Sequence, residues 1–279
     1  MRMLLDSLVV CLLLTQQNGS YELTPLAAKF LVRSSPEYLG FMMEADAHWE
    51  PWAHLVEVIR RGKPLYRIEQ QQEKAAEFFP FLVRSLHVMN REPARLAAKV
   101  LGVGNSQQGL RVLDIACGSG VWGIAVAEAN PLARLTAQDF PEILDITREY
   151  LQRHGVESQY DFLPGDLNEV DLGRDRYDLA LLGNIVHSQG ARAARDLFRR
   201  LFAALRAGGR VVIVDMIPNE DRTGPPFSIF FALEMLLHTE EGDTFTLSQY
   251  SQWLQEAGFI RVETVEIGSH SPLIIGFKP

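Results

Sequence analysis

The spacing of apolar residues divides the chain into two regions. Up to about residue 103, apolar residues recur mostly at helical spacing. After Leu110, short apolar runs alternate with amphipathic stretches, which is the pattern of alternating strands and helices. We therefore predict a helical region over residues 1–103 and an α/β domain over residues 104–279, with a polar linker at 102–109.

The first region begins with the signature of a helix, a hairpin and a second helix. Asn18-Gly19 lies between two short runs, and both residues of such a turn favour positive φ. Thr24-Pro25 then provides a hydroxyl N-cap followed by proline at the first helical position. This order corresponds to the back half of a winged-helix unit, so we expect the chain to begin inside that unit. Residues 36–103 are expected to be helical.

The second region predicts a doubly wound, Rossmann-like sheet of seven strands with helices on both faces. The last two strands are joined by a short connection, so they are expected to pair antiparallel. The predicted strands are 111–115, 134–138, 160–163, 177–182, 210–216, 260–265 and 273–277. The predicted helices are 121–128, 141–154, 191–206, 247–257 and one between 227 and 238.

Charge and cysteine content narrow the class of protein. The net charge of −8 does not favour binding to a phosphate backbone, so we expect no nucleic-acid partner. Cys11 and Cys117 are far apart in sequence, which predicts neither a disulfide framework nor a metal centre and fits a cytoplasmic protein. Asp6 interrupts the apolar N-terminal run, and no small-residue cleavage site follows, which favours folded structure over a secretory signal. The run is also too short to cross a membrane.

A glycine-rich turn follows the first strand of the α/β region. Gly118, Gly120 and Gly123 satisfy the GxGxxG pattern, which taken alone fits a nicotinamide dinucleotide equally well. Asp114 stands four residues before the first glycine, where it can orient the loop and reach a cationic amino group. A pyrophosphate has no use for a carboxylate there, so Asp114 argues against a dinucleotide-linked oxidoreductase.

Two further acids follow the next two strands. Asp139 ends the second strand, where a carboxylate can accept hydrogen bonds from both ribose hydroxyls, although it could also cap the helix that begins at Pro141. Asp166 follows the third strand and could accept a hydrogen bond from an adenine amino group, although it could also belong to an ordinary Gly-Asp turn. Acids at three successive strand ends are more specific than any one alone.

With these motifs in place, the chain resembles the small-molecule O-methyltransferases of the plant caffeate, hydroxyindole and bacterial polyketide-tailoring types. The matching segments are VLDIACGSG, AQDFPEILD, LPGDL, YDLALLGNIVH, GGRVVIVDMIPNEDR and TFTLSQYSQWLQEAGF. The resemblance implies a winged-helix dimerisation domain, a homodimer and S-adenosylmethionine as cofactor. It further implies methyl transfer to a hydroxyl of a small aromatic or polyketide-like acceptor.

The resemblance also implies roles for individual residues, with no metal ligand among them. The cofactor site would contain Asp114, Cys117, Gly118, Ser119, Gly120, Asp139, Phe140, Gly165, Asp166, Leu167 and Asn184. The acceptor pocket would contain Phe230, Phe231, Glu234, Met235 and His238, although such an apolar cluster can equally be plain core.

His187 falls where the family places its catalytic base, just after the fourth strand. A histidine with an ordinary pKa near 6.5 can accept a phenolic proton at neutral pH. The alternative is a loop histidine that caps the helix expected at Ala191 or faces solvent.

Three positions near the expected base depart from the family's pattern. Ser188 follows the histidine where an acid is usual, and Gly183 stands where plant members have a lysine. Thr244 occupies the place of the glutamate that orients the histidine in plant enzymes. Glu234 and His238, four residues apart on one helix, are candidate partners for His187 instead.

Two other functions stay open at this stage. A member of the fold can bind S-adenosylmethionine and catalyse chemistry other than methylation. A DNA-binding regulator would need a basic recognition helix, whereas the first helix offers only Arg2 and also carries Asp6.

Overall fold

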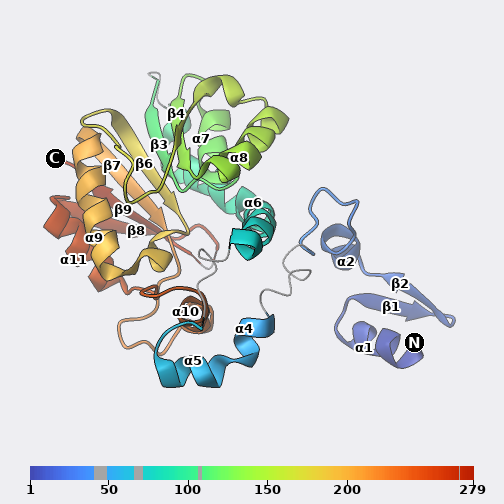
Figure 1. Ribbon diagram of the computed structural model, residues 1–279. Helices are drawn as coiled ribbons and strands as arrows, with labels where there is room; N and C mark the ends of the chain where they lie inside the picture. Colours follow the sequence, from blue (N-terminus) through green and yellow to red (C-terminus); the bar gives the residue numbers. More distant parts are fainter. Residues whose placement is uncertain (41–48, 66–71, 106–108, 270) are drawn as a thin grey trace.

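A seven-stranded sheet forms the centre of the α/β region in the computed structural model (Figure 1). The structure describes residues 1–40, 49–65, 72–105, 109–269 and 271–279. The strand order is β5-β4-β3-β6-β7-β9-β8, with β9 antiparallel to both β7 and β8 and the other pairs parallel. The strands are β3 (Arg111–Ile115), β4 (Arg134–Asp139), β5 (Tyr160–Pro164), β6 (Tyr177–Gly183), β7 (Leu205–Val214), β8 (Arg261–Val265) and β9 (Leu273–Phe277). The predicted doubly wound sheet with antiparallel closing strands is confirmed.

Helices cover both faces of the sheet because successive strand residues point to opposite sides. In β7, Val211 and Ile213 enter one hydrophobic cluster while Val212 and Val214 enter the other. The cluster with Val212 and Val214 packs beneath α6, α7 and α8, and the cluster with Val211 and Ile213 packs beneath α9 and α11. These helices are α6 (Gln72–Val100), α7 (Val121–Ala129), α8 (Pro141–His154), α9 (Val186–Ala204) and α11 (Leu247–Ala257).

The N-terminal unit consists of α1 (Arg2–Val10), β1 (Leu14–Gln17), β2 (Ser20–Leu23) and α2 (Pro25–Phe30). Its hairpin turns at Asn18 and Gly19, which have φ values of 50° and 80°, as the sequence predicted. Thr24 caps α2 by accepting a hydrogen bond from the Ala27 N–H. In Figure 1 this unit lies apart from the α/β region, so the rest of the chain covers little of it.

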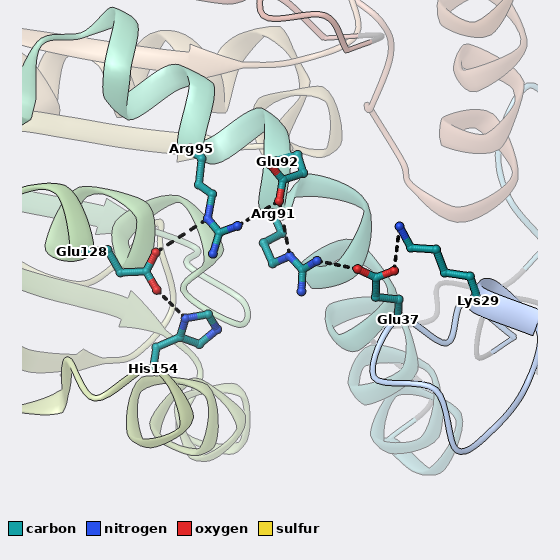
Figure 2. Close-up of polar contacts among 7 residues, drawn as sticks. All are labelled: Lys29, Glu37, Arg91, Glu92, Arg95, Glu128 and His154. Carbon is teal, nitrogen blue, oxygen red and sulfur yellow. Dashed lines mark hydrogen bonds and ion pairs between the residues drawn. The ribbon is translucent and has the colours of Figure 1, made fainter. Parts of the chain in front are cut away.

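A chain of ion pairs joins the N-terminal unit to α6 and then to the α/β layer (Figure 2). Glu37 pairs with Lys29 at 2.9 Å and with Arg91 of α6 at 2.7 Å. Arg95, one turn further along α6, lies 3.8 Å from Glu128 of α7, which pairs with a histidine of α8. One side of α6 therefore touches neighbouring parts of both regions.

Three helices lie below the carboxyl edge of the sheet as drawn in Figure 1. They are α4 (Trp49–Ala53), α5 (Leu55–Arg61) and α10 (Pro226–His238). Elsewhere, a 3₁₀ turn at Val103–Asn105 follows α6. A second 3₁₀ turn, Glu157–Gln159, precedes β5. Helices α4, α5 and α6 lie within residues 36–103, which were expected to be helical, but residues 36–40 form turns and irregular structure instead. Residues 41–48 and 66–71, and 106–108 of the expected linker, lie outside the described residues.

One helix begins earlier than predicted, and another continues through a proline. The helix expected from Ala191 begins at Val186 instead, with a kink at Gly190, where the backbone is not helical. Helix α6 continues to Val100 through Pro93, because alanines beyond the proline pack in the core against α7. Since α6 packs on the α/β layer, the division at 103/104 stays a prediction.

Among the described residues, no helix is long and apolar enough to span a membrane. The same residues contain no group of three or more side chains suited to hold a metal ion.

Candidate active site

The glycine-rich loop between β3 and α7 is held in an unusual backbone conformation. Ala116, Gly118 and Gly120 all have positive φ, at 47°, 56° and 75°. Glycine accepts this region readily, whereas alanine does so at a cost that its surroundings must offset. The Gln138 side chain provides one such contact, accepting a hydrogen bond from the Ala116 N–H while donating to the Gly165 carbonyl. Gln138, which the sequence analysis did not single out, thus ties the loops after β3 and β5 together.

The loop is also anchored from the opposite side. The Gly118 N–H donates to Asp139 Oδ2 at 2.9 Å, and the Thr147 hydroxyl of α8 donates to the Gly118 carbonyl at 2.6 Å. The buried Cys117 thiol lies 3.6 Å from the Thr147 hydroxyl. These contacts, all made within the protein, hold the loop in place.

Asp114 lies beneath the loop and is only 1% exposed. Its Oδ2 accepts a hydrogen bond from the Gly123 N–H at 3.2 Å. Burial raises the pKa of this carboxyl to about 8. The hydrogen bond from the Gly123 N–H is consistent with the first role expected for Asp114, which is to orient the loop. The second expected role, contact with a ligand's amino group, stays a prediction.

Asp139 and Asp166 lie at the ends of the neighbouring strands β4 and β5. Burial raises the pKa of Asp139 to about 6, opposed by hydrogen bonds from the Gly118 and Phe140 N–H groups. Asp166 accepts a hydrogen bond from the Asn168 N–H, so it does form the turn considered as its alternative role. Beside them Phe140 is 51% exposed and Leu167 is buried. The structure therefore places these expected cofactor residues along one edge of the sheet.

Asn184 continues this edge at the end of β6. It has a positive φ of 58°, and its N–H donates to the Val214 carbonyl of β7.

His187 is buried and hydrogen-bonded to an acid, rather than being a solvent-facing loop residue. Its Nδ1 lies 2.6 Å from Oδ1 of Asp215, which follows β7 directly. Its backbone N–H donates to the other oxygen of the same carboxylate at 3.0 Å. From sequence, Glu234 and His238 are the candidate partners of His187. Asp215 is the acid that contacts the imidazole.

Asp215 is fully buried and accepts four hydrogen bonds. Besides the two from His187, it accepts one from the Met216 N–H at 2.9 Å and one from the Tyr250 hydroxyl at 2.7 Å. Burial and the adjacent carboxylate raise the pKa of Tyr250, which keeps its hydroxyl protonated as a donor. A carboxylate so placed can only accept, so it selects the imidazole tautomer with its proton on Nδ1. Nε2 is then left with a free lone pair.

Helix α10 lies next to this histidine. The Phe231 ring meets the His187 imidazole edge-on with centroids 4.9 Å apart, and Phe227 stacks beside Phe231 at 6.0 Å. The structure thus brings Phe231 into contact with His187, while Phe230 is 65% exposed and Met235 is buried.

The two polar residues expected in the acceptor pocket contact each other and α4. His238 Nε2 lies 3.1 Å from Glu234 Oε1, and Glu234 Oε2 accepts a hydrogen bond from the Trp52 indole at 2.7 Å. These contacts attach α4 to α10 beside the site.

A close approach explains one departure from the family's pattern. A Cβ atom on Gly183 would lie 2.2 Å from Cδ1 of the Trp122 indole, so no larger side chain fits there. Trp122 itself is buried at the start of α7. The indole therefore occupies the space into which a side chain at position 183 would project.

Comparison with known proteins now adds to this geometry. The O-methyltransferase domain family matches residues 54–260. The tetracenomycin polyketide synthesis 8-O-methyl transferase TcmO of Streptomyces glaucescens is 30% identical over 284 residues, covering 99% of this chain and 81% of that protein. The chain belongs to the O-methyltransferase family. A 3-hydroxy-5-methyl-1-naphthoate 3-O-methyltransferase of Streptomyces sahachiroi is 25% identical, with 92% of this chain and 74% of that protein covered.

Solved structures agree with this assignment. An O-methyltransferase family protein from Burkholderia thailandensis superposes with a TM-score of 0.87 at 25% identity, covering 99% of this chain and 83% of that one. Human N-acetylserotonin methyltransferase in complex with S-adenosylmethionine shares the fold, with a TM-score of 0.83 at 24% identity over 99% of this chain and 82% of that one. This methyltransferase is S-adenosylmethionine-dependent, as the family is.

The residues at the sheet edge fit that cofactor. Two carboxylates at adjacent strand ends suit ligand hydroxyl and amino donors, and the constrained glycine loop allows close backbone approach.

Proposed function

We propose that this methyltransferase transfers a methyl group to a hydroxyl of a small aromatic or polyketide-like acceptor, with His187 as the general base. The observation that carries the proposal is the hydrogen bond between His187 Nδ1 and buried Asp215 at 2.6 Å. It fixes the tautomer and leaves Nε2 free to accept the proton of an acceptor hydroxyl. Asp215 stabilises the imidazolium that forms, as buried acids do in other base–acid pairs.

The cofactor site is proposed to consist of the glycine loop and the two strand-end acids. Asp139 would accept hydrogen bonds from the ribose hydroxyls, and Asp166 with Leu167 would contact the adenine. S-adenosylmethionine, when bound, supplies an electrophilic methyl group on its sulfonium. The chain's own task is then to hold the acceptor oxygen in line with that methyl group, about 3 Å away.

The acceptor is proposed to be aromatic because aromatic rings already border the base. Phe231 packs edge-on against His187, and Phe227 extends the same apolar wall. TcmO and the naphthoate 3-O-methyltransferase are relatives whose names specify a polyketide and a naphthoate as acceptors. A fused-ring phenol of that kind could bury a large apolar area against these phenylalanine rings and make edge-to-face contacts with them.

A panel of phenols assayed with radiolabelled S-adenosylmethionine tests the proposal. We expect methylation of fused-ring phenols, and His187→Ala is expected to lower kcat by about 10²–10⁴, the usual contribution of a positioned base. An acceptor already ionised at the assay pH should lose far less rate in this variant. An equal loss for ionised and neutral acceptors would mean that His187 positions the acceptor and takes no proton. Tight cofactor binding without methylation of any phenol would favour chemistry other than methylation.

The N-terminal region is proposed to form a homodimer interface. Apolar side chains stand exposed on α1, the hairpin, α2, α4 and α5, and such exposed apolar surface is typical of protein–protein interfaces. They include Met3, Leu4, Val10, Leu12, Leu23, Leu26, Trp49, Val56 and Ile59. A second copy of the chain would cover these faces by symmetry. The cytoplasmic location expected from the cysteines stays a prediction.

A further inference from the structure

A buried histidine of α6 touches the cofactor loop. His87 Nδ1 lies 3.0 Å from the Ser119 hydroxyl, and both residues are almost fully buried, at 6% and 3% exposure. Ser119 stands between Gly118 and Gly120, the two left-handed glycines of the loop. The contact therefore reaches the loop between two glycines, where the backbone has the greatest conformational freedom to be restricted.

The neighbours of His87 leave it little freedom. Its ring stacks on Tyr150 of α8 with centroids 3.9 Å apart and planes at 25°. One turn earlier on α6, Val83 lies beside Gly118, close enough that a Cβ on this glycine would be 3.7 Å from the valine side chain. Helix α6 is fastened to α8 in the same turn by the ion pair of Arg84 with Glu149 at 2.7 Å. The imidazole is thus held in one orientation and presents Nδ1 to the loop.

Burial lowers the pKa of His87 to about 3, with His154, Arg91 and Arg153 adding to the effect. The ring is therefore neutral at physiological pH. A neutral imidazole can either accept a hydrogen bond from the Ser119 hydroxyl at Nδ1 or donate one to it, and both arrangements hold the hydroxyl oxygen in place. His87 has no counterpart among the residues that the sequence analysis assigned to the cofactor site.

We propose that His87 is a positioning residue for the cofactor: acting through Ser119, it holds the glycine loop in its binding conformation. The inference rests on the proposed cofactor site. The Ser119 hydroxyl is hydrogen-bonded to His87 of α6, so Ser119 contributes to cofactor binding by fixing the shape of the loop. Helix α6 then belongs functionally to the cofactor site, although it precedes the α/β region in sequence.

The same turn of α6 also contacts the N-terminal unit. Arg91 follows His87 by four residues, which places both on one side of the helix, and Arg91 pairs with Glu37 (Figure 2). One turn of α6 therefore contacts both the glycine loop, through His87, and Glu37, which pairs with Lys29 of the N-terminal unit.

Calorimetric titration of the full chain with S-adenosylhomocysteine tests the inference. Loss of one neutral hydrogen bond predicts that His87→Ala binds about threefold to tenfold more weakly. The KM for S-adenosylmethionine should rise by the same factor, while kcat at saturating cofactor and the KM for the acceptor stay unchanged. Ser119→Ala should reproduce the effect, and the double variant should bind no more weakly than either single one.

Two matched variants separate positioning from packing. His87→Asn places a polar group where Nδ1 lies, whereas His87→Gln places it where Nε2 lies, and both remove the stacked ring. We expect Asn to restore binding relative to Gln. Arg95→Gln, on the same helix and half-exposed, should leave the dissociation constant unchanged.

Several outcomes would overturn the inference. They are unchanged binding in folded His87→Ala, unchanged binding in Ser119→Ala, additive effects in the double variant, or an equal loss in Arg95→Gln. If His87→Ala does not fold, Ser119→Ala and the Asn and Gln pair carry the test. Wild-type protein that fails to bind S-adenosylhomocysteine would refute the proposed cofactor site, whereas normal wild-type binding with unaffected variants refutes the role of His87 alone.

Discussion

Replacing Asp215 by asparagine tests the catalytic arrangement most directly, because the change keeps the shape of the side chain and removes its charge. The carboxylate accepts two hydrogen bonds on each oxygen, two of them from the backbone N–H groups of His187 and Met216. An amide has one acceptor oxygen and one NH₂ donor. Whichever way the asparagine is turned, its NH₂ group faces one backbone N–H that cannot rotate away.

The two orientations have different consequences for the base. With the amide oxygen toward Tyr250, the NH₂ group faces His187 Nδ1 and donates to it. The imidazole must then carry its own proton on Nε2, so Nε2 has no lone pair to accept the proton of the acceptor. With the amide oxygen toward Nδ1, the useful tautomer is kept, but the negative charge that stabilises the imidazolium is lost. Both orientations leave a buried N–H unsatisfied, so we expect the free energy of unfolding to fall by about 1–3 kcal/mol. We expect kcat for a neutral phenol to fall by about 10²–10⁴.

The assay compares kcat, the dissociation constant of S-adenosylhomocysteine and urea denaturation for the wild type and the variant. Asp178→Asn is the matched control, because Asp178 also accepts a hydrogen bond from a backbone N–H, that of Arg111, but lies outside the site. The control should lose stability without losing kcat. A kcat for Asp215→Asn within about twofold of the wild type, with normal cofactor affinity, would refute the assignment of Asp215 as the partner of the base.

Three further predictions follow from the same geometry. Tyr250→Phe should lower kcat by about tenfold or less and move the acid limb of the kcat/KM profile to higher pH. The reason is that Asp215, with one donor fewer, stabilises the imidazolium of His187 more strongly. An acid limb that does not move would mean that Tyr250 has no influence on His187. Asp139→Ala should weaken S-adenosylmethionine binding by about 2 kcal/mol or more in calorimetry. Since the pKa of Asp139 is about 6, wild-type affinity should fall as pH drops below 6, and a dissociation constant that stays constant across this pKa would contradict this. Light scattering at micromolar concentration should give the mass of a dimer, and a monomer would disprove the proposed interface.

Most strands of the α/β region could be predicted to within one or two residues. Their apolar runs end at glycine, proline or acidic residues, and buried parallel strands leave few alternatives for such runs. Helix ends were harder to predict. The helix predicted from residue 191 begins at Val186 and is kinked at Gly190, and α6 runs through Pro93 because the alanines after it pack in the core.

Site residues at the ends of strands could be predicted from the sequence. Residues whose role depends on a contact between distant parts of the chain could not. Asp215 directly follows β7, but the predicted strand 210–216 contains it, so the strand-end reasoning that singled out Asp139 missed it. Tyr250 carries no such signal, because its place on the buried face of α11 is that of an ordinary core residue. The same holds for His87, whose contact with Ser119 joins residues 32 positions apart.

The departures from the family's pattern become coherent once the contacts around His187 are considered together. Ser188 cannot orient the base, because its hydroxyl donates to the Ile185 carbonyl and closes its own turn. Thr244 offers no charge in place of the orienting glutamate. Asp215 reaches the imidazole from the neighbouring strand and also binds its backbone N–H, so one carboxylate fixes both the ring and the helical turn that carries it. Two contacts to one residue restrict the histidine more than a single side-chain contact would. Asp215 thus orients His187 without any contribution from Ser188 or Thr244, so these two departures give no reason to infer a different reaction.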